Sequence, residues 1–470
     1  MQTVKILIGG QWCETNERTI VKNPYSGEEV CEVCKGGEPE LIRSIELAEE
    51  SFKKLRNLAK FEIAKGLRAI ADGIQSRKQD FVDSIITESA KPSIYTRAEV
   101  ERAINTFNWA AGEAERFAGE LVPIETQPAG KGRYAIVRRV PRGVIYGITP
   151  FNFPLNLVAH KVAPAIASAN SIIIKPSQKT PLTALLLGEV FLESGLPESA
   201  LQVVPMDVEL IPLVLKDERI KMISFTGSAE VGWKLKSLAG KKAITLELGG
   251  NAPVIIDETA DIDLSVNKSV FGAFAYSGQV CISVQRIFVQ EKIFDEWVEK
   301  FVNLARNLRR GDPRDETTQI SSMIDENAAK RIEQWVNEAV SAGAKLLCGG
   351  RREGNFYEPT VLTNTSSEMR IVSEEAFAPV AVIEKFAEFD EAISLANNTK
   401  YGLQAGVFTK DFARAKHAFA ALEYGGVIIN DVPTLRIDNM PYGGVKDSGF
   451  GREGLKYAME EMTEIRLMVF

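Results

Sequence analysis

One cysteine and one glutamate have the residue types and the setting that nucleophilic catalysis needs. Glu247 opens the segment ELGGNAP, and Cys281 ends the segment GQVC. Glycines beside both residues let the backbone approach a ligand closely. A thiolate is a good nucleophile at neutral pH, and a carboxylate can serve as a general base. Plainer roles fit equally, because a lone cysteine is usually a buried apolar residue and a lone glutamate a solvated one.

Two further segments place polar groups at the ends of predicted strands. In TPFNFP, Asn152 carries a side-chain amide that could donate to a substrate oxygen. In IIIKPSQKTP, Lys175 could meet an anionic or ribose group. Ligands of open α/β sheets bind outside the carboxyl ends of the strands, where both residues are expected. The alternatives are a turn-forming asparagine between prolines and a helix cap made by Ser177 or Thr180.

A third segment, SFTGSAEVG, leads from a predicted strand into a predicted helix through Gly227 and Gly232. It resembles a phosphate-binding turn, in which backbone N–H groups and a helix N-terminus face an anion. Because it lacks both the G-x-G-x-x-G pattern and the lysine of a P-loop, the pattern alone does not identify the ligand.

The elements that must position these residues alternate between strands and helices. Short apolar strands alternate with helices from Arg142 to Gly250, and residues 251–457 repeat the alternation with different spacing. This pattern predicts two α/β domains, each a parallel sheet covered on both faces, with a cleft between them. Amphipathic patterns predict earlier helices over 38–55, 60–89 and 97–118.

Two predicted strands stand apart from this alternation. They are RYAIVRRVP, residues 133–141, and the C-terminal TEIRLMVF, residues 463–470. Both are candidates for pairing between subunits, which would make the protein a homo-oligomer, either a dimer or a tetramer. Pairing within one chain explains the pattern equally well.

Composition excludes several other classes of protein. Lys and Arg total 56 against 63 Asp and Glu, and the net charge of −7 does not favour a nucleic-acid or membrane partner. No apolar run reaches the roughly 18 residues that cross a bilayer. The N-terminus lacks the apolar core of a signal peptide, so we expect a cytoplasmic protein.

The cysteines and histidines indicate neither a disulfide framework nor a metal site. The five cysteines include a C-x-x-C pair, Cys31 and Cys34, in a segment that alternates like a strand. Side chains three apart on a strand face opposite ways, which favours plain strand residues. With two histidines, His160 and His417, the chain is poorly supplied for a zinc site or a Ser-His-Asp set.

Taken in order, the segments resemble the aldehyde dehydrogenase superfamily. The match extends over nearly the whole chain and adds ESAKP (88–92), EEAFAPV (374–380) and PYGGVKDSGFGREG (441–454). The resemblance implies an α/β fold of two parallel-sheet, Rossmann-like domains with a small β oligomerisation element. It implies these boundaries: an NAD(P)-binding domain over 1–122 and 142–246, a catalytic domain over 247–456, and oligomerisation strands over 123–141 and 457–470.

Within this family, a cysteine attacks an aldehyde to give a thiohemiacetal, hydride passes to NAD(P)+, and the resulting thioester is hydrolysed. By motif, Cys281 is the nucleophile, and Asn152 with the Cys281 backbone N–H forms the oxyanion hole. Glu247 matches the base that activates the water, and because CoA-acylating relatives generally lack it, it implies a free acid as product. Glu453 matches a glutamate that assists the proton relay, and Lys161 a lysine near the active site. Either could also be an ordinary helix or loop charge.

The resemblance also implies a coenzyme site. Lys175 matches the residue that contacts the adenosine ribose. Members that prefer NAD often carry a glutamate three residues later, where this chain has Gln178. A neutral amide does not repel the 2′-phosphate of NADP, so NAD with NADP tolerated is implied. The expected coenzyme residues are Thr149, Pro150, Phe151, Lys175, Ser177, Gln178, Gly227, Ser228, Gly249, Glu375 and Phe377.

The implied substrate is a small aldehyde. The stretch PTLRIDNMPYGGVKDSG is most like the lactaldehyde-type dehydrogenases, which implies lactaldehyde or glycolaldehyde. The alternative is an aldehyde with an anionic tail, such as succinate semialdehyde or glyceraldehyde-3-phosphate. Arg102 matches an arginine of the non-phosphorylating glyceraldehyde-3-phosphate dehydrogenases, and Arg436 lies in the loop at the substrate mouth. Two arginines could hold such a tail bidentately.

Other observations weigh on the substrate. That phosphate-using branch usually has arginine directly before its cysteine, so Val280 counts against a phosphorylated aldehyde. Phe153 and Ile282 are the other expected substrate neighbours. In a purely structural role, Arg102 would pair with a glutamate on its own helix, and Arg436 with Asp438 or Asp431. A remote alternative is a nucleotide-binding protein without catalysis.

Overall fold

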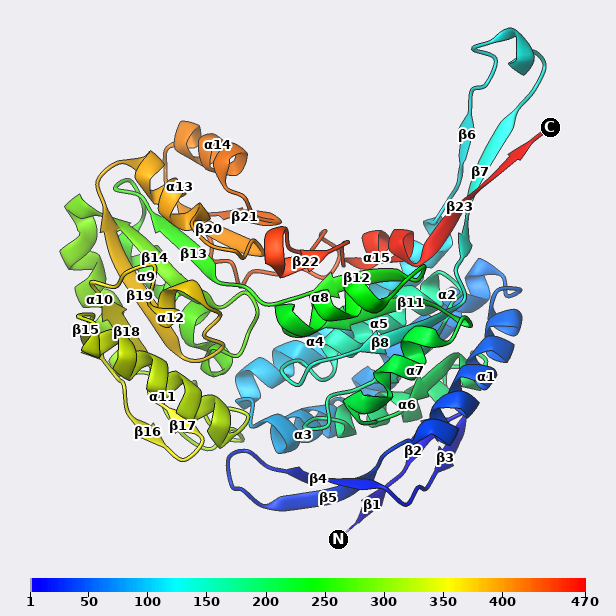
Figure 1. Cartoon of the computed structure of the whole chain (residues 1–470), viewed down its shortest axis with the longest axis horizontal. Helices are drawn as coiled ribbons and strands as arrows, with labels where there is room; N and C mark the ends of the chain where they lie inside the picture. The colour runs from blue at the N-terminus through cyan, green and yellow to red at the C-terminus, as the bar shows by residue number, and fades with distance from the viewer. Residues whose placement is uncertain (1) are drawn as a thin grey trace.

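The computed structural model describes residues 2–470, and two large sheets dominate it (Figure 1). The first sheet has eight strands in the order β22-β12-β11-β8-β9-β10-β2-β3. Strands β12, β11, β8, β9 and β10 run parallel, and the outer strands are antiparallel. Their bounds are β2 (Ile6–Ile8), β3 (Gln11–Cys13), β8 (Val144–Ile148), β9 (Ser171–Lys175), β10 (Leu201–Val203), β11 (Ile220–Thr226), β12 (Ala243–Glu247) and β22 (Gly449–Phe450).

The second sheet has seven strands in the order β15-β18-β19-β14-β13-β20-β21. All neighbours pair in parallel except β15 with β18. The predicted α/β fold with two parallel sheets is therefore confirmed, with antiparallel strands added at the edges. The bounds are β13 (Ala252–Ile256), β14 (Val284–Gln290), β15 (Lys345–Cys348), β18 (Thr360–Thr363), β19 (Val380–Phe386), β20 (Gln404–Phe408) and β21 (Gly426–Ile429).

Helices cover both faces of each sheet because the strands alternate apolar side chains between the faces. In β9, Ile172 and Ile174 belong to one core and Ile173 to the other. The first core contains α2 (Lys60–Ser76), α3 (Lys78–Ser89), α4 (Ser93–Arg116), α5 (Asn156–Ala167), α6 (Leu182–Leu192) and α15 (Leu455–Glu461). The opposite core contains α1 (Glu38–Leu55), α7 (Ile211–Lys216) and α8 (Ala229–Leu238).

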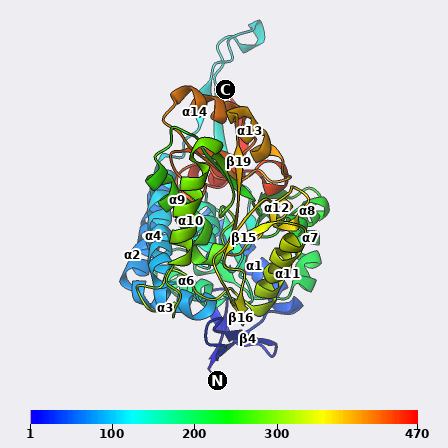
Figure 2. The ribbon, with the colours of Figure 1, turned by 90° about the vertical axis from the view of Figure 1, so that its left-hand side faces the viewer.

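The second sheet is covered in the same way. Figure 2 shows α9 (Ile262–Phe274) and α10 (Phe294–Arg306) on one side of it. The other side carries α11 (Glu326–Ser341), α12 (Arg370–Ser373), α13 (Phe389–Asn397) and α14 (Phe412–Ala421).

Two predicted helices need correction. The helix expected over 60–89 is two helices, α2 and α3, because Arg77 between them leaves the helical region at φ −106° and ψ 23°. The helix expected over 97–118 is α4, which begins earlier, at Ser93, and ends at Arg116. Pro92 directly precedes it, and proline is tolerated at a helix start because it has no N–H to donate.

The C-x-x-C pair lies in a strand, as the sequence predicts. In β5 (Glu29–Cys34), Cys31 and Cys34 are free thiols that pack into opposite cores. This strand pairs with β1 (Thr3–Val4) and β4 (Arg18–Lys22) in a small separate sheet. No helix within residues 2–470 has the length and apolar character needed to span a membrane.

The two stray strands form an arm that projects from the body of the molecule (Figure 1). The arm has three antiparallel strands in the order β23-β7-β6, with bounds β6 (Glu120–Val122), β7 (Ala135–Pro141) and β23 (Thr463–Val469). The sequence leaves open whether these strands pair between subunits or within one chain. In the structure they pair within one chain. Leu121, Ile465, Leu467 and Phe470 leave more than half of their surfaces exposed on this arm.

Candidate active site

The carboxyl ends of neighbouring strands bring several expected site residues to one edge of the first sheet. Lys175, Thr226 and Glu247 end β9, β11 and β12, and Asn152 follows β8 in the bend before α5. Because these four strands are neighbours and parallel, their ends open on the same side.

Cys281 comes from the other sheet, in the turn that precedes β14. Three successive residues before it have positive φ, namely Tyr276 at 51°, Ser277 at 53° and Gly278 at 68°. Such strained backbone persists only where its surroundings fix it. Here Ser277 Oγ donates to the Ser321 carbonyl at 2.7 Å, and a Cβ at Gly278 would lie 2.1 Å from the Ala378 carbonyl oxygen.

Asn152 contacts the loop that carries Cys281. Its Nδ2 donates to the carbonyl of Gln279 at 2.9 Å, while its Oδ1 is buried without a hydrogen-bond partner among the described residues. A primary amide has two N–H groups, and this contact uses one of them. The structure thus brings together the asparagine of one sheet and the cysteine loop of the other.

Cys281 is partly buried, and its Sγ lies 3.1 Å from Tyr442 Oη. Burial, with a smaller contribution from the carboxyl groups of Glu375 and Glu247, raises the pKa of the Cys281 thiol, and the net value is about 11. The Tyr442 hydrogen bond and the charge of Arg436 act in the opposite direction. Loss of either opposing group would therefore reduce the thiolate population at a given pH.

Glu247 is buried, and neither of its carboxylate oxygens has a hydrogen-bond partner within residues 2–470. Burial raises the pKa of Glu247 well above its usual range, and the neighbouring carboxyl of Glu453 adds to the shift. A carboxyl in this state is a stronger base than an exposed one once it ionises.

Glu453 has the opposite environment. Lys161 Nζ lies 3.2 Å from one carboxylate oxygen, and an Arg436 guanidinium nitrogen donates to the other at 2.9 Å. Burial alone would raise the pKa of Glu453, but Lys161 and Arg436 outweigh it and hold the pKa at about 2. Lys161 also donates to Ser224 Oγ at 3.0 Å. The two buried carboxyls are therefore driven apart in pKa.

The structure corrects the ion pairs that the sequence suggests for the two arginines. Arg102 pairs with Asp438 at 2.7 Å and not with a glutamate of its own helix. Arg436 pairs with Glu453 and with neither aspartate. The predictions fail because Asp438 lies far along the chain from Arg102, where local spacing gives no information. His160 Nε2 also contacts Asp438, at 2.8 Å.

Arg436 keeps one buried N–H group without a partner. Its side chain is 6% exposed, and its Nε forms no hydrogen bond to the described part of the chain. The guanidinium lies 3.7 Å from the centre of the Tyr442 ring, and the hydroxyl of that ring contacts Cys281. An unpaired buried donor of this kind is costly unless a ligand satisfies it.

The remaining expected substrate neighbours surround the same point. Phe153 lies edge-on to Tyr276, with 6.4 Å between ring centres. Ile282 is buried in a small cluster with Leu403 and Tyr442, against which Val280 packs. These three side chains are apolar, but Arg436, Glu247 and Glu375 lie near enough to act on the Cys281 sulfur, so the surroundings of Cys281 as a whole are not neutral.

The expected coenzyme residues from the two sheets also approach one another. The rings of Phe151 and Phe377 lie 5.8 Å apart, and the Gly250 N–H donates to Glu375 at 3.0 Å. A Cβ at Gly249 would lie 2.3 Å from a Glu375 oxygen, so a larger residue there would displace the Glu375 carboxylate. Burial raises the pKa of Glu375 to about 7.

These residues fit a dinucleotide. Ser228 stands at the N-cap of α8 but its side chain caps no N–H group, so the first N–H groups of the helix can face a phosphate. The hydroxyls of Thr149 and Thr226 are buried without partners inside the described range. Lys175 is buried, which lowers its pKa. The structure thus leaves anion-binding and hydroxyl groups unsatisfied where the coenzyme is expected.

Gln178 and Ser177 lie in the turn after β9. Gln178 Nε2 donates to Asp207 Oδ1 at 2.5 Å, and Lys35 pairs with the other oxygen of Asp207 at 2.6 Å. The sequence does not reveal Asp207, because it follows β10 without any motif. The side chain at residue 178 is neutral, as expected, but the carboxylate of Asp207, which follows a different strand, lies directly beside it.

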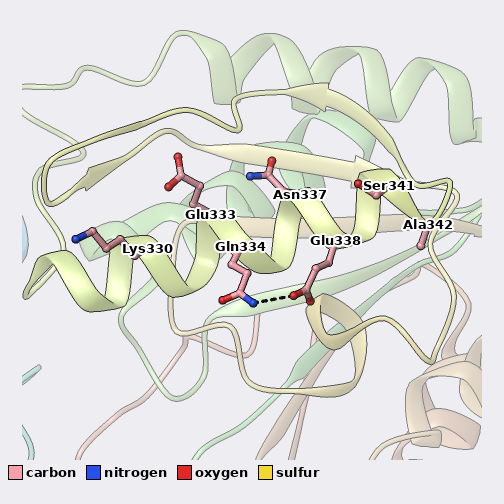
Figure 3. A pocket seen from close by; sticks show the side chains of 7 residues that line it. All are labelled: Lys330, Glu333, Gln334, Asn337, Glu338, Ser341 and Ala342. Atoms are coloured by element: carbon pink, nitrogen blue, oxygen red, sulfur yellow. Dashed lines mark hydrogen bonds between the residues drawn. The ribbon is translucent and has the colours of Figure 1, made fainter.

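Tyr442, Gln279, Lys91 and Glu99 are further residues that motif reasoning does not assign. Lys91 and Glu99 form a buried ion pair, and the ammonium lies 3.7 Å from the centre of the Phe153 ring. In the sequence, Lys91 is marked only by the segment ESAKP, and Tyr442 only by its position before two glycines. A separate surface hollow along α11 contains none of the expected site residues (Figure 3).

Fold and site together define an α/β protein in which a cysteine, an amide and a glutamate meet between two sheets. Residues 12–468 match the aldehyde dehydrogenase family. A 3-sulfolactaldehyde dehydrogenase of Priestia aryabhattai is 42% identical over 465 residues, which cover 99% of this chain and 97% of that protein. A lactaldehyde dehydrogenase of Methanococcus aeolicus is 40% identical over 470 residues, covering 99% of each chain.

Solved structures agree. Aldehyde dehydrogenase 21 of Physcomitrella patens, in complex with the reaction product succinate, has a TM-score of 0.98 and 41% identity, covering 100% of this chain and 98% of that one. A glyceraldehyde-3-phosphate dehydrogenase of Methanocaldococcus jannaschii, complexed with NADP, has a TM-score of 0.93 and 39% identity, covering 97% and 100%. The chain belongs to the aldehyde dehydrogenase family, and it oxidises an aldehyde with NAD or NADP.

Proposed function

We propose that Cys281 is the nucleophile, with Asn152 and the Cys281 backbone N–H as the oxyanion hole. The thiolate Sγ adds to the carbonyl carbon, and the former carbonyl oxygen takes the negative charge beside the Asn152 amide. Asn152 supports this role because its Nδ2 already contacts the carbonyl of Gln279, two residues before Cys281. Loss of one such donor typically costs about 2.7–4 kcal/mol of barrier.

Glu247 acts in this proposal as the general base. It removes a proton from water, which then cleaves the thioester to the free acid and regenerates the Cys281 thiol. Its burial and raised pKa support the role, since a base works best with a pKa near the working pH. Glu453 assists this relay as an ionised carboxylate near Glu247, and Lys161, a lysine near the active site, holds it in that state.

The coenzyme is held by the residues that fit a dinucleotide. When bound, NAD(P)+ supplies the hydride acceptor. The domain proposed to bind it covers 1–122 and 142–246, although β6 at its boundary belongs to the arm. The domain proposed to supply the cysteine covers 247–456, although its strand β22 joins the first sheet. Asp207 beside Gln178 disfavours a 2′-phosphate, but its ion pair with Lys35 offsets part of that charge, so we propose NAD with NADP tolerated.

For the substrate we propose a short aldehyde with an anionic tail, preferably one that also carries a hydroxyl group, such as 3-sulfolactaldehyde. The observation that carries this choice is the buried, unpartnered Nε of Arg436, whose guanidinium lies over the tyrosine that contacts Cys281. An anionic oxygen there would satisfy the donor. Arg102, 28% exposed, is available as a second contact.

Lactaldehyde is a second candidate, favoured by a different observation. Both arginines already pair with carboxylates, Arg102 with Asp438 and Arg436 with Glu453. Their charges are therefore balanced without a substrate, and the wall made by Val280 and Ile282 is neutral. A short neutral hydroxyaldehyde fits such a site.

The test is formation of reduced coenzyme from 3-sulfolactaldehyde, succinate semialdehyde and lactaldehyde, with NAD or NADP and without CoA. An anionic substrate predicts that Arg436→Met raises KM by about 10- to 100-fold for anionic aldehydes, as expected for a charge-assisted bond, but not for lactaldehyde. The exposed Arg351→Met is the matched control. Equal effects on both aldehydes would favour the neutral substrate.

The catalytic roles have their own tests. Cys281→Ala should abolish oxidation while coenzyme binding persists, and Glu247→Gln should slow thioester hydrolysis more than hydride transfer. Turnover by the Cys281 variant would refute the mechanism. Activity only with CoA would contradict the free-acid product, and binding of coenzyme without turnover of any aldehyde would favour the non-catalytic alternative.

The arm is proposed to join subunits into a dimer or tetramer. Its outer strands β6 and β23 each pair on one side only within the described chain. Exposed apolar residues on an unpaired edge favour association with another chain. We expect the arm to be buried in such an assembly.

A further inference from the structure

Tyr442 has three contacts that fix its position, and one of them is with the Cys281 sulfur. It is 3% exposed, and its backbone exchanges hydrogen bonds with Glu453, at 3.0 and 2.7 Å. The ring lies beneath the guanidinium of Arg436, 3.7 Å from the ring centre. The hydroxyl lies 3.1 Å from Cys281 Sγ. Backbone pairing and stacking hold the phenol in place.

We propose that Tyr442 is a catalytic residue whose hydroxyl donates a hydrogen bond to the Cys281 thiolate and keeps it ready for attack. The inference rests on the proposed role of Cys281 as nucleophile. A phenylalanine ring would fill the same space but could not donate. The hydroxyl, and not the ring, is therefore the functional group.

The charges around the sulfur explain why a donor matters there. Glu247 and Glu375 disfavour a thiolate, and Arg436 and Tyr442 favour it. Arg436 is shared with Glu453, so its charge is partly balanced before it acts on the sulfur. Tyr442 is the group that touches the sulfur directly, and a hydrogen bond to an ion is stronger than one to a neutral partner.

The tyrosine stays in the donor state. Burial raises the pKa of Tyr442 well above its usual value, and the adjacent thiol raises it further. A protonated phenol beside a thiolate can only donate. The positive charge of Arg436 above the ring makes the phenol a better donor, because it draws electron density from the ring.

The hydrogen bond from Tyr442 to Cys281 changes in strength during the reaction. A thiolate accepts strongly, whereas the sulfur of a thiohemiacetal or thioester is a weak acceptor. The hydrogen bond therefore stabilises the free enzyme and is weakened once the carbon–sulfur bond forms. Removing it should reduce the thiolate population while leaving each thiolate at least as nucleophilic, since nucleophilicity rises with thiol pKa.

The experiment is alkylation of Cys281 by iodoacetamide as a function of pH, in the full-length protein without coenzyme. Losing a charge-assisted bond should move the midpoint of Tyr442→Phe upward by about one to two pH units. At pH 8, below the midpoint, the rate should fall by about tenfold or more. Tyr357→Phe is the matched control, because Tyr357 is fully buried with an unpaired hydroxyl elsewhere in the second domain.

A merely structural role predicts another pattern. A displaced loop would lower the alkylation rate at every pH, including the alkaline limit, without moving the midpoint. That pattern would overturn the proposal, and so would an unchanged profile. If Tyr442→Phe does not fold, a fluorinated tyrosine at the same position, a stronger donor, must speed alkylation at pH 8, and no change would overturn the proposal.

The result is separable from the fate of the proposed function. If Cys281→Ala keeps full turnover, the proposed nucleophile is wrong. If Cys281 is essential but the Tyr442→Phe variant is alkylated at the same rate as the unaltered enzyme and has the same turnover, only the proposed role of Tyr442 is wrong.

Discussion

The buried ion pair between Lys91 and Glu99 links the two loops of the candidate active site. Both side chains are fully buried, and the second carboxylate oxygen of Glu99 accepts the N–H groups of Leu155 and Asn156, at 3.0 and 3.1 Å. The ammonium faces the Phe153 ring in the Asn152 loop at 3.7 Å. It also faces the Tyr276 ring in the Cys281 loop at 4.5 Å.

Lys91→Met should therefore destabilise the fold and misalign the site. The methionine leaves the charge of Glu99 buried without its cation, which typically costs about 3–5 kcal/mol. Burial already lowers the pKa of Lys91 to about 8, against the attraction of Glu99. Adding Glu99→Gln removes the stranded charge while keeping an acceptor for the two N–H groups. The double variant should recover most of the lost stability.

Thermal unfolding at one fixed protein concentration measures both effects, since assembly shifts the apparent Tm. Lys78→Met is the control, because Lys78 of α3 and Glu101 of α4 form a partly exposed ion pair, and such a pair is worth less than about 1 kcal/mol. The reasoning fails if Lys91→Met melts like the control. It fails equally if the double variant melts no higher than Lys91→Met alone.

Four other predictions follow from the same structure. Glu247→Gln should stabilise the fold at neutral pH, because an unfolded Glu247 ionises near 4.5 whereas the folded one has a raised pKa; the gain should vanish below pH 4.5. Glu453→Gln should destabilise the fold at neutral pH, because the folded pKa of about 2 contributes stability that is present above about pH 4.5 and is lost as the pH falls. Melting curves against pH test both variants, and stability changes of equal sign would contradict the prediction. Asp207→Asn should raise kcat/KM for NADP relative to NAD in steady-state assays, and an unchanged ratio would remove Asp207 from coenzyme choice. Leu467 of the arm is 59% exposed, and Leu467→Glu should reduce the mass measured by light scattering; an unaltered mass would count against assembly through the arm.

The sheet interiors and the order of motifs could be predicted from the sequence because they depend on local patterns. A strand such as SIIIK alternates between two cores, and each core needs apolar side chains whatever lies beyond it. The glycines at 249 and 250 are expected to let the backbone approach a ligand; in the structure they lie close to the Glu375 carboxylate and the Cys281 carbonyl, and approach to a ligand stays a prediction.

What could not be predicted depends on contacts between distant residues. The partner of Arg102 is Asp438 and that of Arg436 is Glu453, and no spacing rule connects such positions. The contact of Tyr442 with Cys281 belongs to the same class. The helix break at Arg77 could not be predicted for another reason. The apolar periodicity continues across this residue, and only its backbone conformation departs from the helix.

The opposite states of Glu247 and Glu453 have one cause, which is the distribution of two cations. Lys161 and Arg436 both bind Glu453, so Glu453 stays ionised and Glu247 has no direct cation partner among the described residues. Pairs of carboxyl groups driven apart in this way commonly divide acid and base roles. Arg436 also lies over Tyr442, so an anionic tail bound to it would draw on the same charge that holds Glu453 ionised and assists the Cys281 thiolate. If the proposed anionic tail binds Arg436, then tail recognition and sulfur reactivity depend on the same guanidinium. The KM test on Arg436 measures the recognition, and the alkylation test on Tyr442 measures the reactivity.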